Sequence, residues 1–130
     1  MLQSGLLALI LANTTPRAYY DEGLSHLRAR SAERAREQLS QLEALHPSDG
    51  HTSLLRGHCA LMLEGDATHA EELYARALAD GGEVQVEALH AFGRLYRQQQ
   101  RWEEADERYA AAVAALQDCL LYTSPSPRDS

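Results

Sequence analysis

The feature that most constrains this chain is a repeat with a period of 35 residues. Alanine recurs at this spacing as Ala35, Ala70 and Ala105. Two further columns keep the same spacing, and they hold Leu39, Tyr74 and Tyr109, and Leu42, Ala77 and Ala112. Such a period is typical of stacked helical hairpins, each of which buries its apolar face only against its neighbours. An ordinary antiparallel helix bundle is the alternative, but a bundle needs no fixed period.

A column of glycines follows the period less strictly. Gly23, Gly57 and Gly93 are separated by 34 and 36 residues, so the middle unit slips by one residue in its first helix or in the loop after it. Pro47 follows Ala35 by twelve residues, where a unit of this kind would end. We therefore expect three units, at residues 16–50, 51–85 and 86–118.

The third unit shows its two expected helices most clearly. In its first helix, one face at positions i, i+3, i+4 and i+7 is formed by Leu89, Phe92, Gly93 and Tyr96. A turn at residues 98–101 leads into a second helix with Ala105, Tyr109 and Ala112 on one face. Gly93 and Ala105 leave room for the two helices to approach closely, and the large side chains fill the space around that contact.

This arrangement resembles the tetratricopeptide repeat, whose pattern is apolar-x2-Leu-Gly-x2-Tyr, then Ala-x3-Phe, then Pro. The residues that match stand from Leu89 to Tyr109, and Gln117 occupies the position of the proline. The resemblance implies an all-α fold, a solenoid of about three antiparallel helix pairs in a right-handed superhelix. It also implies that the repeated columns pack the helices against one another, and that the first helix of each pair lines a concave surface.

In the family, this concave surface usually grips an extended peptide or a partner helix. We laid its inward-facing positions onto this chain, the second unit being placed to within one residue. The expected groove residues are Arg17, Tyr20, Leu24 and Leu27 in the first unit, Leu55, Cys59 and Met62 in the second, and Glu87, His90, Arg94 and Arg97 in the third.

This expected groove is mostly apolar in its first two units and cationic in its third. We therefore expect an amphipathic or apolar ligand whose acidic end contacts Arg94 and Arg97. Chaperone-binding members of the family hold a C-terminal carboxylate through Lys and Asn on the first helix. Tyr20 and Leu24 occupy those positions here, which argues against that kind of clamp.

The net charge and the short apolar runs limit the kinds of partner that the chain can bind. The net charge is −7 and the isoelectric point is about 5.3, which argues against general attraction to nucleic acid or to an anionic membrane surface. No apolar run approaches the roughly 20 residues that a membrane span needs. The predicted partner is therefore a protein or peptide, with no nucleic acid and no membrane span.

The chain carries no motif for catalysis. It has no Gly-rich phosphate loop, no nucleophile elbow and no H-E-x-x-H sequence. His51, His58 and His90 could share one face near Cys59, but no pair has the spacing of a zinc site. We expect Cys59 to pack as a small apolar residue in the core or groove. We therefore expect no enzyme activity, no metal, no cofactor and no small-molecule substrate.

The segment before the first unit, residues 1–15, allows two interpretations. Its apolar run from Leu6 to Ala12 could be the core of a secretory signal, but no Lys or Arg precedes it. Leu7 and Ile10 lie 35 residues before Leu42 and Leu45, which favours the second helix of a preceding repeat. The compartment stays open, with the cytoplasm favoured over the periplasm.

The last residues break the helical pattern. The segment from Cys119 to Asp129 reads CLLYTSPSPRD, and it resembles the translation of a common transposase sequencing adapter. We expect residues 119–130 to be a non-native disordered tail, so that the native protein continues beyond Asp118. A native disordered tail with Ser-Pro phosphorylation sites is the alternative. If the tail is not native, Cys59 is the only cysteine and no disulfide can form within the chain.

These observations predict a non-catalytic interaction scaffold that binds a peptide or partner helix in its concave groove. The alternative is that the repeats are the docking or regulatory part of a larger enzyme, or of an envelope or secretion assembly factor. A catalytic domain beyond Asp118 would favour the alternative.

Overall fold

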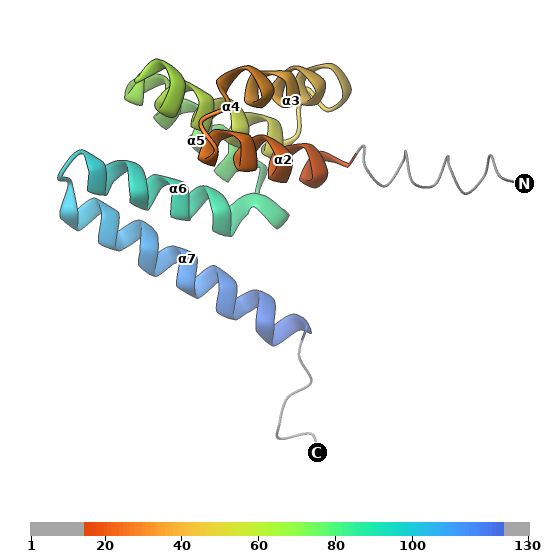
Figure 1. The fold of residues 1–130 in the computed structure, drawn as a ribbon. Helices are drawn as coiled ribbons and strands as arrows, with labels where there is room; N and C mark the ends of the chain where they lie inside the picture. The colour runs from red at the N-terminus through yellow and green to blue at the C-terminus, as the bar shows by residue number, and fades with distance from the viewer. Residues whose placement is uncertain (1–14, 124–130) are drawn as a thin grey trace, which may run out of the picture.

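The computed structural model describes residues 15–123, and this part of the chain is all-α, as predicted (Figure 1). No strand occurs within it. The elements are α2 (Pro16–Arg28), α3 (Ala32–Leu45), α4 (Gly50–Glu64), α5 (Ala67–Asp80), the short 3-10 helix η1 (Gly82–Val84), α6 (Gln85–Gln98) and α7 (Trp102–Thr123).

Local sequence signals explain where the helices begin and end. Pro16 occupies the first turn of α2, and the Thr15 hydroxyl accepts a hydrogen bond from the backbone N–H of Ala18 at 3.2 Å. Asp66 caps α5 by accepting from the backbone N–H of His69 at 3.0 Å. Helix α4 ends at Gly65, whose φ of 66° lies in the left-handed region that favours glycine.

Consecutive helices pair into three antiparallel hairpins, α2–α3, α4–α5 and α6–α7 (Figure 1). Each first helix approaches its neighbour most closely at its glycine. A Cβ added to Gly57 would lie 2.6 Å from Cε1 of Tyr74, which belongs to the second helix of the same hairpin. At Gly23 the closest neighbour is Leu55 of the next hairpin, 2.7 Å from such a Cβ. Any larger residue would require the facing side chain or the helix itself to shift.

The repeated columns lie in the core or at its edge. Ala35, Ala70 and Ala105 are buried where each second helix meets its partner, and Leu39 and Tyr109 are half-buried. The slip in the middle unit is also visible. Helix α5 begins ten residues after Gly57, whereas α7 begins nine residues after Gly93. The extra residue belongs to the end of α4 and its loop.

Neighbouring hairpins are held together by aromatic contacts. Tyr74 of α5 meets Phe92 of α6 edge to face, with ring centroids 5.9 Å apart. The Tyr96 hydroxyl of α6 donates to Oε1 of Glu71 on α5 at 2.9 Å. Helix α4 is buried on more than one side, because α2, α3 and α5 all pack against it. These contacts fix the relative placement of the first helices, which form the site.

The two ends of the chain lie partly outside the described residues. The expectations for residues 1–14 and 124–130 lie outside the described residues. Helix α7 continues to Thr123, so residues 119–123, which we expected to be part of the disordered tail, are helical instead. Residues 119–123 contain no proline, and Pro125 is the first after Pro47, so nothing in this stretch stops the helix. No helix in the described part is both long and apolar enough to span a bilayer.

Candidate binding groove

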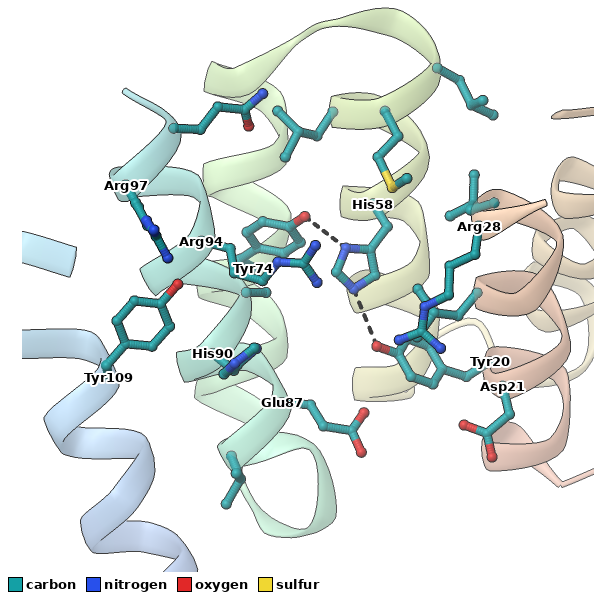
Figure 2. Close-up of a pocket in the computed structure, with 18 of the residues that line it drawn as sticks. Tyr20, Asp21, Arg28, His58, Tyr74, Glu87, His90, Arg94, Arg97 and Tyr109 are labelled. Atoms are coloured by element: carbon teal, nitrogen blue, oxygen red, sulfur yellow. Dashed lines mark hydrogen bonds between the residues drawn. The ribbon is translucent and has the colours of Figure 1, made fainter. Parts of the chain in front are cut away.

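An open groove of about 1400 Å³ lies between the first helices of the three hairpins (Figure 2). Helices α2, α4 and α6 supply most of its walls. Tyr74 of α5 reaches into it from behind, and Trp102 and Tyr109 of α7 close its third-hairpin end. The groove therefore draws side chains from all three hairpins.

Most of the groove residues expected from the sequence do line it. These residues are Arg17, Tyr20, Leu24, Leu27, Met62, Glu87, His90, Arg94 and Arg97. The prediction is wrong for Leu55 and Cys59, which are buried in the core with 0% and 4% of their surface exposed. His58, one residue before Cys59, lines the groove instead. The register of α4 was therefore placed one residue too late, where the repeat period slips.

His58 lies at the centre of the groove floor and bridges two hairpins. Its Nε2 is 3.2 Å from the Tyr20 hydroxyl of α2, and its Nδ1 is 2.9 Å from the Tyr74 hydroxyl of α5 (Figure 2). A neutral imidazole has one N–H donor and one acceptor nitrogen, so one tyrosine accepts from it and the other donates to it. Both ring nitrogens are thus satisfied without an external ligand.

The surroundings of His58 disfavour its charged form. Burial, then the charges of Arg94 and Arg28, lower its pKa to about 4. Burial also raises the pKa of the Tyr20 and Tyr74 hydroxyls well above their usual range. At neutral pH this triad is therefore uncharged and adds nothing to the positive charge of the groove arginines.

The groove is cationic although the chain as a whole is acidic. Five arginines and two carboxylates line it, whereas the net charge of the chain is −7. The carboxylates are Asp21 and Glu87, and both pair with Arg17. The Arg17 Nη1 atom lies 3.5 Å from Oδ1 of Asp21 and 2.5 Å from Oε1 of Glu87. A third contact, from its Nε to Oε1 of Glu83 at 3.1 Å, ties α2 to η1. Arg17 is therefore neutralised within the fold.

The other arginines of the groove have no such partners. The side chains of Arg28, Arg94 and Arg97 form no ion pair or hydrogen bond with any residue from 15 to 123. Figure 2 shows Arg28 of α2 and Arg94 of α6 extending toward His58 from opposite walls. An anion entering the groove would meet both guanidinium groups.

The groove also exposes large apolar side chains. Trp102 and Met62 expose 57% and 53% of their surface, which is unusual for large apolar side chains. Tyr109 packs edge to face on His90, with centroids 5.4 Å apart. These side chains offer a surface on which an apolar side chain of a ligand can pack.

The described part of the chain also holds possible metal ligands and a cysteine, Cys59. Among residues 15–123 no group of three or more His, Cys, Asp and Glu side chains is placed to hold a metal ion. Burial raises the pKa of the Cys59 thiol to about 11, so it is protonated and unreactive at neutral pH.

Among the groove residues that sequence reasoning missed are Arg28, His58, Tyr74 and Trp102. Arg28 lies directly after Leu27 in the last turn of α2, where a basic residue is ordinary for a helix end. Tyr74 was assigned to the packed column, and its hydroxyl extends past the core into the groove. Only the one-residue slip in the glycine column pointed toward His58.

No family model matches the chain, and no relative is found among curated proteins.

Proposed function

We propose that the chain is a non-catalytic scaffold of the tetratricopeptide type, a right-handed solenoid that binds a segment of a partner protein in its concave groove. The repeat period and the three hairpins support the solenoid assignment. The observation that carries the binding proposal is the groove itself: one continuous concavity lined by the first helix of every hairpin. Its length and open side suit an extended peptide or a short helix better than a small molecule.

The chemistry of the lining supports the same proposal. Exposed apolar side chains such as Met62 and Trp102 stand beside unpaired arginines, a combination that suits a polypeptide with mixed side chains. Tyr20 and Tyr74 are held by His58, so part of the surface is already ordered before a ligand arrives. Pre-ordered side chains reduce the entropy lost on binding.

Site-specific photo-crosslinking tests the proposal in cells that express the chain. A photoreactive amino acid at Leu24 lies in the groove, and one at Gln41 lies on the exposed face of α3, outside it. We expect a discrete cross-linked protein from position 24 that Met62→Glu abolishes, and none from position 41. Equal cross-linking at both positions, or insensitivity to Met62→Glu in a folded variant, would contradict groove binding.

A further inference from the structure

Among the unpaired arginines of the groove, Arg28 and Arg94 extend from opposite walls toward His58 (Figure 2), in a chain that has a surplus of carboxylates. The sequence holds 19 Asp and Glu residues but 12 Lys and Arg residues. Arg17, in the same groove, has three carboxylate partners, yet Arg28 and Arg94 have none among residues 15–123. The fold thus places three carboxylates beside Arg17 and none within ion-pair distance of Arg28 or Arg94 among residues 15–123.

Arg28 and Arg94 are placed so that one anion could contact both. Arg28 and Arg94 extend from facing walls toward the same imidazole, and both act on its charge (Figure 2). Both side chains are exposed on the open side of the groove, so an anion can reach them. A single carboxylate between them could bind both, because a planar guanidinium fork binds carboxylate oxygens in pairs.

The floor beneath the two arginines can also adapt to an anion. Tyr20 and Tyr74 both bond to His58. If an anion stabilised the imidazolium, both ring nitrogens would donate, and both tyrosine hydroxyls would be released to donate toward the ligand. The neutral imidazole releases only one of them.

Apolar side chains flank this position and indicate what surrounds the acid. Leu24 and Leu61 lie in the same groove, as does the exposed Met62. A free inorganic anion would leave them uncovered, whereas a peptide would cover them with its neighbouring side chains. The acidic balance of the chain disfavours nucleic acid as the source of the charge.

We propose that the groove recognises an acidic, otherwise apolar peptide segment, holding one Asp or Glu side-chain carboxylate between Arg28 and Arg94 above His58. The position is central in the groove, not at its third-unit end beside Arg97. This inference rests on the proposed function, because it names the partner chemistry of that same groove.

Binding of two matched peptides tests the inference with the full chain. One fluorescein-labelled peptide alternates Leu and Glu, and its counterpart alternates Leu and Gln. By fluorescence anisotropy at low salt, we expect the Glu peptide to bind at least about tenfold tighter. Arg28→Gln and Arg94→Gln should each remove most of that preference. Arg76→Gln, on the exposed outer face of α5, is the matched control and should leave it unchanged.

The outcomes separate this inference from the proposed function. If both peptides bind equally and Met62→Glu weakens both, the groove binds peptides but the carboxylate site is wrong. If neither peptide binds, NMR of the His58 ring decides. Glutarate should raise the imidazole pKa in the parent chain and leave it unchanged in the Arg28→Gln, Arg94→Gln double variant. No effect of glutarate, or an effect of inorganic phosphate alone, would overturn the carboxylate proposal.

Discussion

Gly93 of α6 faces Tyr109 of α7 so closely that a Cβ on the glycine would lie 2.6 Å from Cε1 of the ring. The same relationship holds between Gly57 and Tyr74 in the second hairpin, at the same 2.6 Å. Real Cβ atoms do not approach this closely, so each contact requires glycine. The two tyrosines differ, however: Tyr74 is 1% exposed, whereas Tyr109 is half-buried.

Alanine at these glycines should therefore destabilise the two hairpins unequally. For Gly57→Ala we expect a loss of about 1–3 kcal/mol, because the buried ring of Tyr74 has no free space to enter. For Gly93→Ala the loss should be smaller, because the Tyr109 ring can rotate outward and alanine favours the helix by up to about 1 kcal/mol. Urea unfolding measures both. A Gly57→Ala variant as stable as the parent would contradict the packing.

The contact between α6 and α7 in the third hairpin allows a second prediction. Ala105 is 2% exposed, so Ala105→Arg forces a long charged side chain into the α6–α7 contact. We expect a loss of several kcal/mol, on the order of an overpacked core or worse. Ala111→Arg, on an exposed face of the same helix, is the control and should be nearly neutral. Thermal unfolding followed by circular dichroism compares them, and equal melting temperatures would refute the assigned register.

His58 should make stability depend on pH. Its pKa of about 4 lies below the ordinary value of 6.5, so the unfolded chain binds more protons between these values. The stabilisation is complete above about pH 6.5 and is lost as the pH falls toward 4. Four neighbours face the ring: Tyr20 and Arg28 from α2, Tyr74 from α5 and Arg94 from α6.

The free energy of unfolding should fall by less than about 3 kcal/mol over this range, because the His58 ring is only half-buried. His58→Gln keeps a donor and an acceptor for the two tyrosines but does not titrate. Urea unfolding of both chains between pH 4 and pH 7 should therefore show a shallower pH dependence in the variant. Parallel curves would show that His58 is not the responsible group.

The ion pair between Arg17 and Glu87 joins the first hairpin to the third across one end of the groove. Both side chains are about one-third exposed, so solvent screens the pair and we expect a coupling energy of about 1 kcal/mol or less. A double-mutant cycle with Arg17→Gln and Glu87→Gln measures it by urea unfolding. The coupling should fall as salt is added. A coupling that salt leaves unchanged would mean that the pair acts through packing instead of charge.

Sequence periodicity predicted the helices well because it reports packing. The alanine column and the glycines sit where helices touch, and those contacts permit few other residues. The groove was harder to predict, because its residues are not constrained by helix–helix packing and follow no strict period. The positions on α2 and α6 were found because the glycines of those helices keep the expected register. Helix α4 carries apolar residues on more than one side, so Cys59 and His58 could not be told apart from the pattern alone.

The arrangement of charges in the groove could be determined only from the three-dimensional structure. Sequence reasoning assigned the acidic end of the ligand to Arg94 and Arg97, which share one helix. The structure adds Arg28 from the opposite wall, far away along the chain, and shows that Arg17 is already neutralised. Which arginines are paired depends on contacts between hairpins, and no local pattern encodes those.

A crystal structure of the chain with the Leu-Glu peptide tests the central claim most directly, because it shows both the fold and the occupant of the groove. The account predicts three stacked hairpins, the peptide in the concavity lined by α2, α4 and α6, and one carboxylate between Arg28 and Arg94. A peptide bound on the outer helices α3 and α5, or an α6–α7 hairpin packed so that no concavity remains, would contradict it.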